Sequence, residues 1–135
     1  MPDRSSIPPP CRRCTALIVD PDLQAGADAA AWLRAAGFDA RVTVDFVAAR
    51  RALASAPPDV LVTALRLGAY NGLHLLMTAR AGGRPIRGVL TGTHEDATLR
   101  AEAQRLAVGY LVKPISREML LEAVRGDPAH AECPG

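Results

Sequence analysis

The segment TALIVDPDLQAGADAAAWLRAA, residues 15–36, changes its hydrophobic pattern once, and that change decides the fold. Residues 15–19 are a short apolar run with β-branched side chains, which predicts a buried strand, and the DPD tripeptide at 20–22 ends the run in a turn. Residues 23–36 then follow a helical pattern, and Gly37 is placed as a C-terminal cap. The segment predicts one strand followed by one helix.

The same alternation repeats four more times along the chain. The further strands are expected at residues 38–44, 60–65, 86–90 and 108–112. The further helices are expected at residues 46–55, 71–81, 94–106 and 116–125. Asp45, Asn71 and His94 are the expected caps at the starts of the first three of these helices. Apolar strands joined by helical crossovers form parallel sheets that are covered on both faces. The sequence predicts a doubly wound α/β fold with five parallel strands and five helices.

Length and composition indicate a single domain without a membrane span. The 135 residues are 49% apolar and 22% charged, and the formal charge of +2 is too small to indicate nucleic-acid or membrane binding. No run approaches the roughly 20 apolar residues of a membrane helix. Residues 1–14 predict a flexible proline-rich tail, 15–125 the folded domain and 126–135 a C-terminal tail. Because the start of the chain lacks the apolar region of a secretory signal, we expect a cytoplasmic protein.

Doubly wound folds place their chemistry at the carboxyl ends of the strands. The residues expected there are Asp20, Pro21, Asp22, Thr63, Ala64, Thr91, Gly92, Lys113 and Pro114. Neither a GxGxxG nor a GxxxxGK[ST] motif follows the first strand, which argues against dinucleotide and nucleoside triphosphate binding.

Four motifs at these strand ends resemble those of a known family. ALIVDPD at 16–22 resembles an acidic motif after the first strand, and PDVLVTALRLGAYNG at 58–72 resembles the third strand with its loop. VLTG at 89–92 resembles a switch strand, and GYLVKP at 109–114 resembles a lysine motif. Together they resemble the CheY-like receiver domain of two-component response regulators. The resemblance implies a flavodoxin-like fold and a signalling module that is not an enzyme.

The resemblance also implies a phosphorylation site, from which this sequence departs twice. In the family, two carboxylates after the first strand and an aspartate nucleophile at the end of the third hold Mg²⁺. The acidic pair aligns with Asp20 and Pro21, Asp22 lies one residue too far on, and the nucleophile position falls on Ala64. Asp59 is no substitute, because it begins the same strand about 15 Å away. We therefore expect a degenerate pseudo-receiver in which Mg²⁺ binding is lost or weak.

The family's switch and phosphate-sensing positions remain, at Thr91, Tyr110, Lys113 and Pro114. Lys113 is either a phosphate sensor or a structural cation, and we favour a structural pair with Asp20. Thr91 is either a switch hydroxyl or, as we favour, a strand-end side chain bonded to nearby backbone. Tyr110 either moves between inward and outward positions or packs at an edge strand, and both alternatives stay open.

By resemblance, the chain is a phosphorylation-independent interaction module. Its partner would be a signalling protein, such as a histidine kinase or an output protein, bound through the fourth helix, fifth strand and fifth helix within residues 93–125. The same face would allow a homodimer. Because only residues 126–135 follow the last helix, we do not expect a DNA-binding output domain. Two alternatives stay open: phosphorylation at Asp20 in a phosphorelay, and a metal or small-ligand sensor in which Ala64 opens an apolar pocket.

Cysteine and histidine in the terminal segments form a separate candidate site. Cys11 and Cys14 make a CxxC pair before the first strand, and His130 and Cys133 make an HxxC pair after the last helix. These are the ligand types and local spacings of a structural zinc site. Because a whole domain separates the pairs, we favour reduced thiols in two flexible tails, with a Cys11–Cys14 disulfide as a further alternative. No other cofactor is expected.

Overall fold

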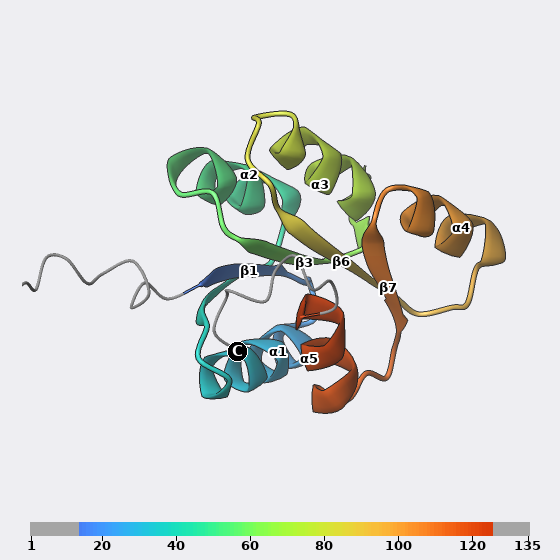
Figure 1. Ribbon diagram of the computed structural model, residues 1–135, viewed down its shortest axis with the longest axis horizontal. Coiled ribbons are helices and arrows are strands. Elements are labelled where there is room, and N and C mark those ends of the chain that lie inside the picture. The colour runs from blue at the N-terminus through green and yellow to red at the C-terminus, as the bar shows by residue number, and fades with distance from the viewer. Residues whose placement is uncertain (1–13, 126–135) are drawn as a thin grey trace, which may run out of the picture.

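The computed structural model describes residues 14–125, and a parallel sheet forms its centre (Figure 1). The sheet has the strand order β2-β1-β3-β6-β7. Its strands are β1 (Thr15–Val19), β2 (Asp39–Thr43), β3 (Val60–Ala64), β6 (Arg87–Gly92) and β7 (Val108–Val112), and every neighbouring pair is parallel. The order reverses between β1 and β3, so the carboxyl ends of these strands flank the switch point of the fold.

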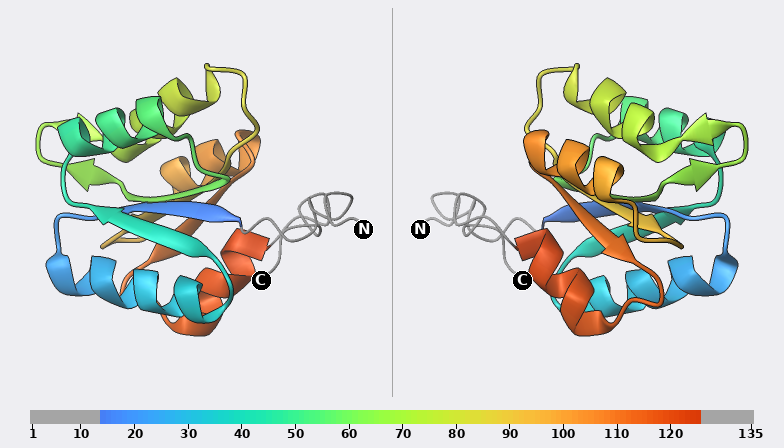
Figure 2. Two further views of the ribbon diagram at one scale, coloured as in Figure 1. Left: turned by 90° about the vertical axis from the view of Figure 1, so that its left-hand side faces the viewer. Right: turned by 90° about the vertical axis from the view of Figure 1, so that its right-hand side faces the viewer.

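Five helices cover the two faces of this sheet, which confirms the predicted doubly wound fold. They are α1 (Leu23–Ala35), α2 (Phe46–Ser55), α3 (Gly72–Arg80), α4 (Ala97–Arg105) and α5 (Arg117–Arg125). Figure 1 and Figure 2 show α1 and α5 on one face and α2, α3 and α4 on the other. Between residues 14 and 125, no helix combines the length and apolar character needed to cross a membrane.

The central strands are buried on both sides, as continuous apolar strands require. Leu17 and Val19 of β1 belong to the core beneath α2, α3 and α4. Ala16 and Ile18, which alternate with them, belong to the core beneath α1 and α5. Side chains of a strand point alternately to the two faces of a sheet, so β1 holds both cores together.

Polar caps start the helices close to the expected positions. The side chain of Asp45 accepts a hydrogen bond from the backbone N–H of Ala48 at 2.8 Å, and that of Asn71 accepts one from Leu73 at 2.7 Å. Each cap satisfies an amide that has no partner inside its helix. Gly37 has a φ of 103° after the end of α1, in the left-handed region expected of a C-terminal glycine.

The fourth helix begins later than its sequence pattern indicates, so the expectation that His94 caps it is wrong. Asp96 is the cap instead, and its carboxylate accepts from the backbone N–H of Leu99 at 3.1 Å. The imidazole Nδ1 of His94 lies 2.9 Å from the Thr93 hydroxyl. A carboxylate in the right position competes better for the free amides of a helix start than an imidazole does.

Two further differences from the expected elements lie near the carboxyl ends of the strands. β6 reaches Gly92 rather than residue 90, because Thr91 and Gly92 pair with Leu111 and Val112 of β7. The loop after β3 contains a short antiparallel pair that periodicity is too brief to signal, β4 (Arg66–Leu67) and β5 (Tyr70–Asn71). The Tyr70 ring stacks on Phe46 at a centroid distance of 4.2 Å, which ties this loop to α2.

Candidate functional site

A cavity of about 470 Å³ opens at the carboxyl ends of β1, β3, β6 and β7. Most residues that the sequence analysis singled out line it, namely Asp20, Pro21, Asp22, Ala64, Thr91, Gly92, Tyr110 and Lys113. Thr63 and Pro114, which were expected at the same place, do not line this cavity. Parallel strands end at the same edge of a sheet, so residues as far apart in sequence as 20 and 113 meet here. This cavity is the candidate functional site.

An ion pair between Asp20 and Lys113 crosses the site. The Lys113 Nζ donates to the Asp20 Oδ2 at 2.9 Å, and the Asp20 side chain is 8% exposed. The other oxygen of Asp20 accepts from the backbone N–H of Asp22 at 2.9 Å. Both oxygens of the buried carboxylate are therefore satisfied, which is what burial of a charge requires. The expected pairing of Lys113 with Asp20 is present.

The other carboxylates at the site are held by helix starts. Asp22 accepts from the backbone N–H groups of Gln24 and Ala25 as the cap of α1. Asp96 caps α4 in the same way. Pro21 and Ala64 stand at the positions where the receiver resemblance implies the second acidic residue and the nucleophile. Neither carries a side-chain oxygen.

This donor set does not fit a magnesium ion. Mg²⁺ demands near-octahedral oxygen ligation, usually by carboxylates that face the ion together. Here a single strand-end carboxylate, Asp20, faces the cavity from β1, and it is already paired with an ammonium group. Within residues 14–125, no three His, Cys, Asp or Glu side chains are placed to hold a metal ion.

Asp59 lies at the opposite edge of the sheet, as expected. Its Oδ2 accepts from the backbone N–H of Thr15 at 2.8 Å, and its Oδ1 lies 3.6 Å from the guanidinium of Arg84. These contacts tie the amino-terminal ends of β1 and β3 together. Asp59 therefore has a structural role at that edge and does not reach the cavity around Ala64.

Thr91 is the site residue that departs most from expectation. Its side chain is 4% exposed, and within the described residues its hydroxyl oxygen has no hydrogen-bond partner. Thr63 on the neighbouring strand, by contrast, donates its hydroxyl to the carbonyl of Ala64 at 2.9 Å. The expectation that Thr91 bonds nearby backbone is wrong, because its side chain faces the cavity and not a strand carbonyl. A buried hydroxyl without a partner is a costly arrangement that a ligand would relieve.

Tyr110 occupies an inward position. Its side chain is 6% exposed, and its hydroxyl donates to the backbone carbonyl of His94 at 2.7 Å. Burial is the main cause that raises the pKa of the Tyr110 phenol, with nearby carboxylates adding to it. An inward ring fits both alternatives left open by the sequence, so whether Tyr110 moves stays a prediction.

Two residues that the sequence analysis did not single out for this role hold Tyr110 in place. The Arg100 guanidinium lies 5.0 Å from the centre of the Tyr110 ring and donates to the Tyr110 carbonyl, while Glu95 binds it from the other side. A side chain at Gly92 would place its Cβ 3.0 Å from the Tyr110 hydroxyl, so glycine makes room for the inward ring. No helical spacing signals this pair in the sequence, because Glu95 precedes α4 and lies five residues from Arg100.

The terminal zinc site falls almost entirely outside the described residues. Cys11, His130 and Cys133 are not among residues 14–125. Cys14 is 3% exposed and is disulfide-bonded. The expectation of a reduced thiol is therefore wrong for Cys14, and its sulfur is not a thiolate that could bind zinc in this structure. The zinc site stays a prediction, and metal analysis of protein purified without chelator tests it.

Comparisons with known proteins agree with this geometry. The family model for the response regulator receiver domain matches residues 16–125. A CheY-like response regulator receiver domain from Methylobacillus flagellatus is 24% identical, with a TM-score of 0.72 over 85% of this chain and 98% of that one. The chemotaxis protein CheY4 of Vibrio cholerae is 22% identical, with a TM-score of 0.74 over 85% and 98%. A search of curated protein sequences gave no significant match.

Proposed function

Because the chain belongs to the response regulator receiver domain family, we propose that it acts in bacterial two-component signalling as a phosphorylation-independent interaction module. In this proposal it is a pseudo-receiver that keeps the switch residues of a receiver and lacks the chemical centre. It has no catalytic activity of its own and works in the cytoplasm.

The side chain at the end of β3 is the observation that carries this proposal. Ala64 is 7% exposed and lines the cavity beside Asp20 and Lys113. Phosphoryl transfer to a protein needs an oxygen, nitrogen or sulfur nucleophile, and a methyl group supplies none. The remaining carboxylate, Asp20, is neutralised by Lys113. This arrangement supports a site that does not accept a phosphoryl group.

The same arrangement supports weak or absent Mg²⁺ binding. In phosphoryl transfer a metal ion neutralises charge on the transferring group, and its ligands must be free to approach it. Asp20 would have to exchange its ammonium partner for the metal, and Pro21 could not assist.

The position of Tyr110 suggests how a partner could bind without phosphorylation. Receivers contact partners through the face made here by α4, β7 and α5, which Figure 1 shows side by side. β7 is the edge strand of the sheet, and both α4 and α5 contact it. Tyr110 is buried and bonded to His94 without a phosphoryl group, which supports a partner contact that does not need phosphorylation. We propose this surface as the contact for a signalling protein or for a second copy of the chain.

Phosphorylation itself is the test. Wild-type protein and the Pro21→Asp/Ala64→Asp variant, which restores both carboxylates, are incubated with Mg²⁺ and acetyl phosphate and weighed by intact mass spectrometry. We expect no covalent mass gain in the wild type. A gain of one phosphoryl unit in the double variant would show that the nucleophile and the metal ligands were the missing parts. A gain in wild type that disappears in Asp20→Asn would refute the proposal and place the acceptor at Asp20.

A further inference from the structure

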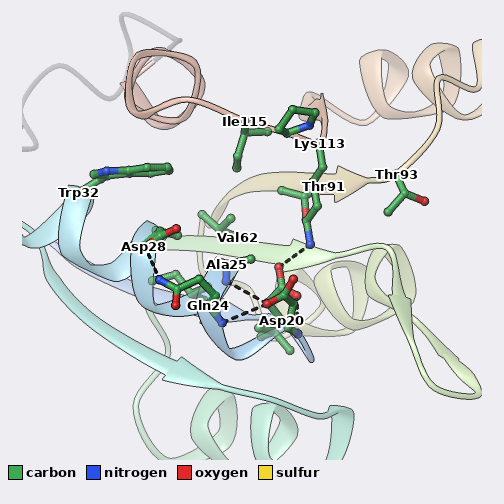
Figure 3. Close-up of a pocket in the computed structure, with 15 residues that line it drawn as sticks. Asp20, Gln24, Ala25, Asp28, Trp32, Val62, Thr91, Thr93, Lys113 and Ile115 are labelled. Carbon is green, nitrogen blue, oxygen red and sulfur yellow. Dashed lines mark hydrogen bonds and ion pairs between the residues drawn. The ribbon is translucent and has the colours of Figure 1, made fainter.

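A second cavity, of about 430 Å³, lies beside the candidate site on the α1 side of the sheet. Figure 3 shows Trp32 of α1 and Ile115 after β7 on two of its sides, with Val62 of β3 near its floor. Ala64 and Tyr110 line the strand-end cavity and are absent from this one. Five residues line both cavities, namely Asp20, Asp22, Thr91, Thr93 and Lys113. The second cavity therefore adjoins the place where a receiver would hold a phosphoryl group and extends from it toward Trp32.

The size and walls of this cavity suit a small organic molecule. Binding sites for such molecules span about 300–1,000 Å³ and combine apolar walls with a few polar groups. Here the indole of Trp32 offers a flat, partly buried face, and Ile115 and Val62 offer aliphatic contacts. The sequence placed a possible apolar pocket at Ala64, which lines the strand-end cavity, and did not indicate this second cavity at Trp32.

The charge of the lining points to a cation. Three aspartates and one lysine line the cavity, which leaves it net negative. Lys113 neutralises Asp20, and Asp22 is bound by the amides of α1. Asp28 accepts one hydrogen bond, from the Gln24 side-chain amide at 2.8 Å, and no cation pairs with it among the described residues. It is half-buried, so its charge acts inside the cavity.

Asp28 also stands one helical turn before Trp32, on the same side of α1. Residues four apart in a helix are neighbours on its surface. A carboxylate beside an indole face is a favourable place for an ammonium group, since the charge and the ring quadrupole both attract it. Both residues line the cavity.

An independent observation supports a polar ligand. The buried hydroxyl of Thr91 lines this cavity and has no hydrogen-bond partner within residues 14–125. A hydroxyl both donates and accepts, so it can bind a polar group of the ligand body. Thr91 and Asp28 are thus two polar groups of the lining that remain available to a ligand.

We propose that this cavity binds a small organic amine with an aromatic or aliphatic body. The ammonium group binds Asp28 beside the Trp32 ring, and the body packs between Trp32 and Ile115. The site requires no phosphorylation and no metal ion, so it can be tested independently of the function proposed above.

Trp32 provides the readout, because it is the single tryptophan of the chain. Selective excitation of indole fluorescence is followed during titration with 2-phenylethylamine, the neutral 2-phenylethanol and the anionic 3-phenylpropanoate. We expect saturable binding of the amine in the millimolar range, as suits a ligand of so few atoms, and about fivefold weaker binding of the alcohol. Weaker amine than alcohol binding, stronger binding of the carboxylate, or no saturation by the amine up to about 20 mM would overturn the proposal.

Two matched pairs of variants locate the site. Asp28→Asn should reduce amine binding to the level of the alcohol, whereas Asp39→Asn, at an exposed position on β2, should change neither ligand. Ala25→Leu places a larger side chain in the cavity and should abolish binding of both. Ala27→Leu lies on the exposed side of the same helix and should not. Amine binding that survives Asp28→Asn unchanged, or that survives in folded Ala25→Leu, would refute the assignment.

Discussion

Replacing Lys113 with methionine is expected to destabilise the protein substantially, because it leaves the Asp20 carboxylate buried without its cation. Methionine keeps most of the length and apolar area of the lysine side chain. Removing one partner of a fully buried ion pair costs about 3–5 kcal/mol. The Lys113 side chain is 24% exposed, so water screens the pair, and Asp20 keeps its bond from the Asp22 amide. We therefore expect a loss of about 2–3 kcal/mol.

Urea unfolding at neutral pH measures this loss. A loss of that size corresponds to a melting temperature about 10 °C lower for a domain of this length. The Lys113→Met/Asp20→Asn double variant buries no unpaired charge, so it should be more stable than Lys113→Met alone. The double-mutant cycle should return a coupling of about 1 kcal/mol or more. Arg105→Met, which breaks an exposed pair with Glu102, is the control and should leave the urea midpoint nearly unchanged.

Equal stability of Lys113→Met and wild type would refute this reasoning. So would a double variant that is no more stable than the single one, because the loss would then come from packing of the lysine stem and not from the charge. Either result would leave Lys113 without the structural role that its contact with Asp20 indicates.

Two further predictions concern residues around the same site. Tyr110→Phe removes the hydrogen bond to His94 and should cost about 1 kcal/mol at neutral pH. Burial raises the pKa of Tyr110 above the 10.0 of an exposed phenol. The contribution of the protonated phenol to stability is therefore fully present below pH 10.0 and is lost as pH rises through the folded-state pKa. Urea midpoints at alkaline pH should consequently fall less in Tyr110→Phe than in wild type. Gly72→Ala would place a Cβ 2.1 Å from the carbonyl oxygen of Ala64, so we expect a loss of about 1–3 kcal/mol in urea unfolding. Gly82→Ala, whose nearest neighbour is 3.5 Å away, is the control, and an equal effect of the two would contradict the steric explanation.

Strand and helix positions were predictable because they depend on local pattern. The apolar run at Thr15–Val19 and the caps at Asp45 and Asn71 are signals within a few residues, and the structure places them as expected. The start of α4 was misplaced because two polar residues compete there, and the choice of Asp96 over His94 depends on which side chain reaches the free amides.

The site was predictable in its membership and not in its contacts. Strand ends and the receiver-like motifs identified Asp20, Ala64, Thr91, Tyr110 and Lys113, and all five line one cavity. The unpartnered hydroxyl of Thr91 and the inward Tyr110 ring were not predictable, because each depends on the position of side chains from other elements.

The sequence by itself determined the alternation of strands and helices, the family, and the chemical identity of each strand-end residue, including the methyl group at Ala64. These follow from short-range patterns and from side-chain chemistry that folding does not alter. Tertiary structure alone decided that Lys113 meets Asp20, that Gly92 leaves room for Tyr110, and that Trp32 faces a cavity. Such contacts join residues that are distant in the chain, and they form only when the sheet brings the strand ends together.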